Sequence, residues 1–272
     1  MKCVLTIAGS DSSGGAGIQA DLKTMTCLGV YGMSAITALT AQNTTGVRDV
    51  LEATPEFVGE QLDCIFEDIR PQAVKIGMVS SAPIIKVIGA KLRQYGAENI
   101  VVDPVMVSTS GSALMQDSAL TALMEELFPL AAIITPNIPE AQRLCGFAIE
   151  TEEDMLRAAE TIGKTMEGAV LVKGGHLSHS ADDLLWQKGQ VHWFRSPRVD
   201  NPNNHGSGCT LSSAIASFLA LGEELPGAVQ KAKAYITAAM EAKLDLGQGS
   251  GPLWHNYAVP AGGGFQQGRG EA

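Results

Sequence analysis

The feature that most constrains the fold of this chain is a regular alternation of short apolar runs with longer segments of helical spacing. The apolar runs are typical of buried strands and cover residues 4–8, 33–40, 73–77, 99–103, 131–135 and 169–173. Helices are predicted at residues 18–28, 55–69, 81–95, 118–128, 139–144 and 151–166. Strands that alternate with helices favour an α/β fold, with a mostly parallel central sheet and helices on both faces.

The C-terminal part of the chain departs from this alternation. Residues 182–186 and 190–194 flank Lys188 and Gly189 and predict a hairpin, and residues 47–53 predict a further short strand. The last helix is expected at residues 226–244. Residues 260–272 are rich in Gly and Gln and lack an apolar pattern, which predicts a disordered tail. Because no linker or repeat divides the remainder, residues 1–259 are predicted to form one domain.

Charge and cysteine content argue against several classes of function. The chain of 272 residues has a net charge of −10, whereas binding to nucleic acid or to a membrane surface needs basic patches. Five cysteines are scattered without a Cys-x-x-Cys pair, so neither a disulfide framework nor a zinc site is predicted. The close pair of His176 and His179 has no third ligand nearby. No apolar run is long enough to span a bilayer, and the first residues resemble a strand rather than a signal peptide, so a cytoplasmic protein is expected.

A loop with two glycines precedes an apolar run that is typical of a buried helix. Gly206 and Gly208 lie in this loop, and residues 211–219 form the run. The first turn of a helix has backbone N–H groups without partners and a partial positive charge, so such a loop is suited to bind phosphate. Cys209 at the helix start is expected to ionise more readily than an ordinary thiol. The alternative is a plain glycine-rich turn over a small buried cysteine.

Polar residues follow several of the predicted strands, at the edge of the sheet where α/β proteins bind ligands. Asp103 either caps a loop or serves a cation or nucleotide. Asn137 and Glu140 form either a helix capping box or an oxygen site for hydrated Mg²⁺. Lys173, before two glycines, either reaches solvent or holds a phosphate. Together, an anion-binding loop, a lysine and carboxylates are the components of phosphoryl transfer.

A second glycine pattern resembles the fingerprint of dinucleotide-binding proteins. Gly15, Gly17 and Ala20 have the required spacing between a predicted strand and a helix. The fingerprint also needs an acidic residue at the end of the second strand, where this chain has the neutral amides Gln42 and Asn43. This difference disfavours a nicotinamide cofactor and leaves a tight turn with close helix packing.

Several of these motifs together resemble the hydroxymethylpyrimidine/phosphomethylpyrimidine kinases of thiamine biosynthesis. The resemblance rests on IAGSDSSGGAGIQAD at residues 7–21, TALTAQNT at 37–44, KIGM at 75–78, DPVM at 103–106, TPN at 135–137, KGGH at 173–176 and HGSGCTLS at 205–212. It extends from about residue 2 to about residue 255. It implies a ribokinase-like three-layer sandwich, ATP and Mg²⁺ as cofactors, a homodimer, and two successive phosphorylations of 4-amino-5-hydroxymethyl-2-methylpyrimidine.

The resemblance also implies roles for individual residues. Gly206, Gly208 and Cys209 match the anion hole, with Cys209 as the catalytic residue. The substrate side is formed by Gly9, Asp21, Gln42, Met78 and Val105, of which Asp21 and Gln42 are the pair that recognises the pyrimidine. The nucleotide or metal side is formed by Asp103, Asn137, Glu140, Lys173 and Lys233, with Asp103 and Glu140 as the carboxylates for Mg²⁺.

The chain differs from the family pattern at Ser207, where a threonine is usual, and either residue supplies a hydroxyl. Wider ribokinase relatives often have an aspartate at the position of Cys209, which is the more obvious base for an alcohol. Two alternatives remain at this stage. One is a pyridoxal or pyridoxine kinase, whose substrate is also a flat heteroaromatic hydroxymethyl compound. The other is a non-catalytic nucleotide-binding protein, which the joint presence of Asp103, Glu140, Lys173 and Cys209 disfavours.

Overall fold

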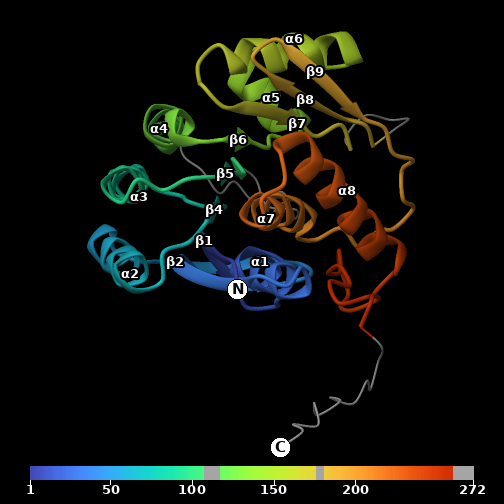
Figure 1. Ribbon diagram of the computed structural model, residues 1–272. Helices are drawn as coiled ribbons and strands as arrows, with labels where there is room; N and C mark the ends of the chain where they lie inside the picture. Colours follow the sequence, from blue (N-terminus) through green and yellow to red (C-terminus); the bar gives the residue numbers. More distant parts are fainter. Residues whose placement is uncertain (107–116, 176–180, 260–272) are drawn as a thin grey trace, which may run out of the picture.

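The computed structural model describes residues 1–106, 117–175 and 181–259, and in this part of the chain nine strands form one sheet (Figure 1). The strands are β1 (Cys3–Asp11), β2 (Tyr31–Asn43), β3 (Gly46–Glu52), β4 (Ala73–Ile76), β5 (Ile100–Val102), β6 (Ile133–Ile134), β7 (Ala169–Val172), β8 (Asp183–Gln187) and β9 (Gln190–Phe194). Their order is β3-β2-β1-β4-β5-β6-β7-β8-β9. Strands β2, β1 and β4 to β7 are parallel to one another, and the pairs β2–β3, β7–β8 and β8–β9 at the two edges are antiparallel.

Helices cover both faces of the sheet, as the alternation of the sequence predicts (Figure 1). One layer consists of α2 (Pro55–Asp68), α3 (Ala82–Gln94), α4 (Asp117–Ala122), α5 (Ile138–Cys145) and α6 (Glu152–Gly163). The other layer consists of α1 (Gly17–Cys27), α7 (Ser207–Ala220) and α8 (Leu225–Glu241). A separate cluster of buried apolar side chains fills each interface between sheet and helices. The strands β4 to β7 are therefore buried on both sides, which explains their continuous apolar sequence.

Local signals in the sequence account for several element boundaries. The hydroxyl of Thr54 accepts a hydrogen bond from the N–H of Phe57 and begins α2. The β8–β9 hairpin turns through Lys188 and Gly189, both with positive φ. The helix predicted at residues 118–128 instead ends at Ala122 and continues as a π turn (Leu123–Leu127) and a 3-10 turn (Phe128–Leu130). Pro129, which lacks an N–H, cannot continue an α-helix there.

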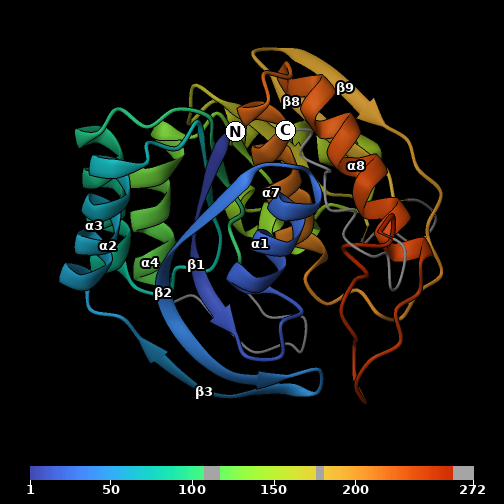
Figure 2. The ribbon, with the colours of Figure 1, turned by 60° about the horizontal axis from the view of Figure 1, so that its bottom comes forward.

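Strand β2 is longer than predicted and forms a hairpin with β3 that reaches beyond the body of the sheet (Figure 2). The register shifts between Ala41 and Gln42. Asn43 accepts hydrogen bonds from the N–H and hydroxyl of Thr45 and so caps the turn of the hairpin. Gln42 therefore does not cap this turn, and its side chain is available to the pocket below.

Two expectations lie outside the described residues: the disordered tail at residues 260–272 and the histidine pair His176 and His179. Within the described residues, no helix has both the length and the apolar content required to cross a membrane.

Candidate active site

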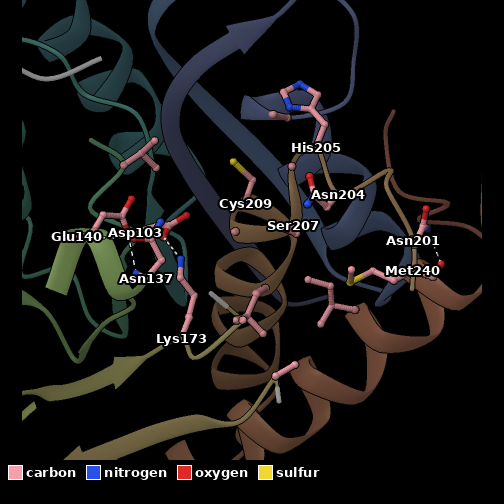
Figure 3. Close-up of a pocket in the computed structure, with 18 of the residues that line it drawn as sticks. Asp103, Asn137, Glu140, Lys173, Asn201, Asn204, His205, Ser207, Cys209 and Met240 are labelled. Atoms are coloured by element: carbon pink, nitrogen blue, oxygen red, sulfur yellow. Dashed lines mark hydrogen bonds and ion pairs between the residues drawn. The ribbon is translucent and has the colours of Figure 1, made fainter. Parts of the chain in front are cut away.

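A pocket of about 1220 Å³ lies at the carboxyl ends of the parallel strands (Figure 3). Its wall combines residues from the sheet, the N-terminus of α7, the start of α5 and the side of α8. All but one of the candidate site residues line it: Gly9, Gln42, Met78, Asp103, Val105, Asn137, Glu140, Lys173, Gly206, Gly208, Cys209 and Lys233. The exception is Asp21. The structure thus brings residues from distant parts of the sequence into one cavity.

The glycines before α7 allow the backbone to approach its neighbours closely. Gly206 is the N-cap residue with φ of 82°, and a Cβ there would lie 1.9 Å from the carbonyl oxygen of Gly15. A Cβ on Gly208 would lie 3.2 Å from Oδ2 of Asp103 and 3.5 Å from Nζ of Lys173. The N–H groups of the first helical turn have no acceptor within the helix. The helix start therefore forms an open cradle for an anion beside the Asp103–Lys173 pair.

Cys209 lies in the first turn of α7 and faces the pocket (Figure 3). The expectation of an easily ionised thiol is wrong, because burial raises the pKa of Cys209 to about 11. The ammonium of Lys75 acts in the opposite direction, and the carboxylates of Asp21 and Asp103 add to the rise. Cys209 is therefore a neutral thiol at neutral pH, despite its position at a helix N-terminus.

Asp103 and Lys173 form a buried ion pair at the centre of the pocket. Nζ of Lys173 donates to Oδ1 of Asp103 at 2.9 Å, and the hydroxyl of Thr135 donates to the same oxygen at 3.1 Å. Although burial opposes ionisation, Lys173 and Lys75 together lower the pKa of Asp103. Burial likewise opposes the charge on Lys173, but its carboxylate neighbours raise its pKa. Both groups are charged and line the pocket, and the hydroxyl of Ser212 lies 3.5 Å from Oδ2 of Asp103.

Asn137 and Glu140 form the capping box that the sequence predicts at the start of α5. The carboxylate of Glu140 accepts from the N–H of Asn137 at 2.8 Å, and the side chain of Asn137 accepts from the N–H of Glu140 at 2.9 Å. Burial raises the pKa of Glu140 to about 7, with Lys173 opposing the rise and Asp103 adding to it. The capping role does not remove Glu140 from the site, because the residue also lines the pocket.

Asp21 requires a correction, because the structure places it below the pocket rather than in its wall. Both of its oxygens accept from Nζ of Lys75, at 2.9 and 2.8 Å, and both side chains are fully buried. The hydroxyls of Thr6 and Ser213 donate to the same carboxylate at 2.6 Å each. These four hydrogen bonds leave Asp21 a structural link between β1, β4, α1 and α7, with no direct route to a pyrimidine.

Lys233 of α8 also lines the pocket. Its ammonium donates to Oδ2 of Asp183 at 2.6 Å, and both side chains are nearly buried. Asp183 also accepts from the N–H of Gly174 at 3.0 Å, which ties the loop after β7 to α8. Lys233 therefore lies in the pocket wall with its charge already paired.

Gly9, Met78 and Val105 contribute an apolar part of the pocket lining. A Cβ on Gly9 would lie 2.4 Å from Cε of Met78, so the methionine packs directly onto the glycine backbone. Met78 and Val105 are partly exposed and line the cavity with apolar surface. This apolar part of the lining suits an aromatic ring.

His205 and Asp11 are pocket residues to which the sequence analysis gives no role. Nε2 of His205 lies 2.8 Å from Oδ2 of Asp11, and both side chains are buried. The amide of Gln42 lies 3.3 Å from the same Nε2 and 3.2 Å from Oγ1 of Thr40. Asp11 and His205 are separated by 194 positions, so no short sequence motif could predict their contact. The only signal in the sequence is a histidine directly before the anion-binding glycines.

Comparison with known proteins gives a consistent family assignment. Residues 11–254 match the phosphomethylpyrimidine kinase family. The hydroxymethylpyrimidine/phosphomethylpyrimidine kinase of Rhizobium meliloti is 52% identical over 255 residues, which cover 92% of this chain and 96% of that protein. The thiamine biosynthesis bifunctional protein of Geobacter sulfurreducens is 52% identical over 257 residues, covering 94% of this chain and 52% of that protein. The chain therefore spans about half the length of the bifunctional relative.

Solved structures share the architecture. The crystal structure of phosphomethylpyrimidine kinase from Clostridium difficile is 51% identical with a TM-score of 0.80, and covers 88% of this chain and 99% of that one. The pyridoxal kinase of Staphylococcus aureus in complex with AMP-PCP and pyridoxal is 35% identical with a TM-score of 0.87, and covers 94% of each chain. These matches confirm the ribokinase-like three-layer sandwich predicted from the sequence.

Proposed function

The chain belongs to the phosphomethylpyrimidine kinase family, and from that premise we propose that it uses ATP to phosphorylate 4-amino-5-hydroxymethyl-2-methylpyrimidine, first to the monophosphate and then to the diphosphate. The observation that carries the proposal is the pocket itself. It combines an anion cradle at the start of α7, the Asp103–Lys173 pair and an apolar part of the lining for an aromatic ring. ATP as the phosphoryl donor is supported by the ATP analogue AMP-PCP in the related pyridoxal kinase of Staphylococcus aureus.

In the first step, the hydroxymethyl oxygen attacks the γ-phosphorus of ATP while the bond to the bridging oxygen of ADP breaks. The transition state of such a transfer is loose, so placement and charge neutralisation carry most of the catalysis. The N–H groups of Gly208 and Cys209 face the developing negative charge, and Lys173 adds a positive charge beside them. The alcohol loses its proton in this step, and our candidate acceptor is the thiolate form of Cys209, which is a minor fraction at neutral pH because the pKa of the thiol is raised to about 11.

In the second step, the acceptor is a phosphate monoester rather than an alcohol. Its second pKa is about 6, so it is already mostly ionised near neutral pH. This step therefore needs no base, and Cys209 would contribute through its backbone N–H alone. The two steps make different demands on the same residue.

A magnesium ion fits between the carboxylate of Asp103, directly after β5, and that of Glu140, in the first turn of α5. Asp103 and Glu140 both line the pocket and influence each other's charge, and Mg²⁺ typically takes one or two carboxylates together with water and phosphate oxygens. Among the described residues, no group of three or more His, Cys, Asp and Glu side chains forms a metal site, so phosphate oxygens would have to complete the coordination. When bound, the ion offsets the charge of the phosphate oxygens.

Gln42 is our candidate for the residue that recognises the pyrimidine. An aminopyrimidine edge presents an amino donor beside a ring-nitrogen acceptor, and a glutamine amide offers the complementary pair. Pyridoxal lacks that amino group. We expect Gln42→Ala to lower kcat/KM for the pyrimidine alcohol about tenfold or more relative to pyridoxal, with KM for ATP almost unchanged. An unchanged ratio between the two substrates would remove Gln42 from this role.

Product analysis tests the activity directly. The chain is incubated with ATP, Mg²⁺ and either the pyrimidine alcohol or pyridoxal, and the products are followed by mass spectrometry. We expect the pyrimidine to gain one and then a second phosphate group. Faster phosphorylation of pyridoxal would favour the alternative, a vitamin B6 kinase, which the structural similarity to pyridoxal kinase makes a serious competitor. ATP consumption without either product would contradict both assignments.

A homodimer in the cytoplasm completes the proposal. Leu39 and Leu51 are cross-strand partners in the β2–β3 hairpin and are 50% and 69% exposed, which leaves an apolar patch at the edge of the sheet. All five cysteines are unpaired, as is typical of a reducing compartment, and the reaction consumes ATP.

A further inference from the structure

The side-chain amide of Gln42 lies between two polar groups, the hydroxyl of Thr40 and the imidazole of His205. The hydrogen-bonding requirements of both groups disagree with the amide oxygen facing Thr40 and the amide nitrogen facing His205. Its oxygen lies 3.2 Å from Oγ1 of Thr40, and its nitrogen lies 3.3 Å from Nε2 of His205. A glutamine amide has an acceptor at one end and two donors at the other, and its two ends are distinguished by their partners. The identity of those partners therefore decides which end faces which neighbour.

Thr40 faces two oxygen atoms but has only one proton. Its Oγ1 lies 2.9 Å from the carbonyl oxygen of Ser10 and 3.2 Å from the amide oxygen of Gln42. A carbonyl oxygen cannot donate, and the shorter contact with Ser10 takes the proton. The atom on the other side of Oγ1 must then be a donor, which only the NH₂ end of Gln42 provides.

At the other end of the amide, two donors face each other: the NH₂ group of Gln42 and Nε2 of His205. Its Nε2 lies 2.8 Å from Oδ2 of Asp11. Although burial opposes ionisation, hydrogen bonds hold the pKa of this carboxyl well below its usual value. The N–H groups of Gly15 and Ala16 donate to the same Oδ2, so Asp11 accepts there and cannot donate. Nε2 must therefore carry a proton. A protonated Nε2 has no lone pair for the NH₂ group of Gln42, so the neighbouring atom is better assigned as the carbonyl oxygen, which shares the proton as the weaker of two acceptors.

We infer that the amide of Gln42 is turned, with its carbonyl oxygen toward His205 and its NH₂ group toward Thr40, and that His205 is the positioning residue that sets this order. Rotation of the amide by 180° gives Thr40 a donor and removes an NH₂ group from a protonated ring nitrogen that cannot accept from it. The single proton on Nε2 then goes mainly to Asp11 at 2.8 Å and is shared with the Gln42 carbonyl oxygen at the longer distance of 3.3 Å. The inference rests on the proposed function only for its consequence, which is the recognition of an aminopyrimidine.

The turned amide keeps one unused hydrogen-bonding position at each end. The carbonyl has a second lone pair and the NH₂ group has a second N–H, and Gln42 lines the substrate pocket. In the aminopyrimidine, the amino group has a ring nitrogen on one side and the carbon that bears the hydroxymethyl group on the other. The order of acceptor and donor on Gln42 therefore decides on which side of the amino group the hydroxymethyl group lies. His205 thereby controls the direction in which the reactive alcohol points.

His205 is itself held firmly in place. A Cβ on Gly15 would lie 2.4 Å from Cδ2 of the imidazole, so the ring packs onto the backbone of this glycine. Asp11 is anchored independently, because it also accepts from the N–H groups of Ser13, Gly15 and Ala16 at 2.8, 3.1 and 2.8 Å. These bonds keep the Asp11 carboxylate satisfied when His205 is replaced, so the loop is expected to survive the substitution.

Two substitutions at His205 separate positioning from packing. His205→Leu removes the donor and keeps much of the volume, whereas His205→Gln retains a donor at a similar reach. We expect His205→Leu to raise KM for the pyrimidine alcohol about tenfold and to lower kcat for it, with KM for ATP within about twofold, because stranded polar groups weaken recognition and the alcohol is less well oriented. His205→Gln should recover most of the loss. Thermal unfolding of each variant checks that the fold is intact.

A double-mutant cycle with Gln42 decides the mechanism. If His205 acts through Gln42, then His205→Leu costs little more in a chain that already contains Gln42→Ala. Thr40→Val removes the acceptor at the other end of the amide and should give the same selective rise in KM, which provides a test if His205→Leu does not fold.

Additive losses in an active enzyme, or equal losses in KM for ATP and pyrimidine, would overturn the inference alone. A wild-type chain that does not phosphorylate the pyrimidine alcohol would overturn the proposed function as well.

Discussion

Lys173 carries the positive charge nearest the anion cradle, since Gly208 approaches its Nζ and the Asp103 carboxylate together. We expect Lys173→Ala to lower kcat/KM more than tenfold, or by about 1.4 kcal/mol or more of transition-state stabilisation. Steady-state kinetics with the pyrimidine alcohol measure this. Lys188→Ala is the matched control, because Lys188 lies in the β8–β9 turn with its side chain 71% exposed. Equal kinetics in both variants would show that Lys173 only balances Asp103.

The role of Cys209 as a proton acceptor can be tested by the pH dependence of kcat/KM. Its raised pKa of about 11 keeps the thiol protonated at neutral pH, so the thiolate fraction grows as pH rises toward that value. If the thiolate accepts the proton of the alcohol, kcat/KM for the first step rises between about pH 7 and pH 10. The second step, from an ionised monophosphate, should be flat over this range.

The variant Cys209→Ala tests the same assignment. It should abolish the slope of the first step and impair that step more than the second. Cys64→Ala, at an exposed cysteine of α2, should leave both pH profiles intact. Equal losses in the two steps would leave Cys209 with an anion-binding role only, in agreement with its neutral state in the structure.

At the scale of elements, the start of α7 depends on Gly206. Gly206 and Gly146 have almost the same backbone, with φ and ψ of 82° and 10° against 82° and 13°. No atom lies within 4 Å of a Cβ on Gly146, whereas a Cβ on Gly206 would meet the backbone oxygen of Gly15 at 1.9 Å. Gly146→Ala should cost about 1 kcal/mol for the left-handed conformation. Gly206→Ala should cost clearly more and should lower kcat at least about tenfold, because the cradle must move.

Thermal unfolding and kinetics of the two alanine variants provide the measurement. A Gly206→Ala enzyme that is as stable and as active as Gly146→Ala would show that the loop after Gly15 yields easily. In that case the cradle is not held in a fixed geometry before substrate binds.

Elements with local signals were predictable from the sequence, and those set by distant contacts were not. The helix starts after Thr54 and Asn137 and the turn at Gly189 follow from caps and turn residues within a few positions. Strand β2 extends beyond its apolar run because β3 pairs with it. The change from α-helix to π turn after Ala122 has no local signal in the sequence, and Pro129 accounts only for the end of the helical segment.

At the scale of the whole molecule, the site is a product of topology. Local motifs identified the residues that meet at the carboxyl ends of the strands, because parallel strands bring those ends together. They did not reveal which polar residues pair with one another. By its motif Asp21 resembles a substrate-binding residue, but in the fold its charge is balanced by Lys75, 54 positions away. No local motif assigns a role to His205, and the structure shows that it pairs with Asp11. Pairing of charges across the fold decides which groups remain for substrate.

The proposed dimer is tested at the edge of the sheet. Leu39 and Leu51 face each other across the β2–β3 hairpin, and edge strands with exposed apolar side chains are prone to pair with another chain. We expect Leu51→Lys to convert the dimer to a monomer, because a charged side chain is costly in an apolar interface. Light scattering coupled to size-exclusion chromatography measures the mass.

The opposite edge of the same sheet provides the matched control. Val191 in β9 is also an apolar residue on an edge strand, 38% exposed, and Val191→Lys should leave the mass of the protein unchanged. A wild-type monomer, or a Leu51→Lys variant that remains a dimer, would remove the hairpin from the interface. Because the same hairpin carries Gln42, loss of the dimer should also raise KM for the pyrimidine alcohol more than KM for ATP. An interface variant with unchanged kinetics would show that each pocket works independently of the partner.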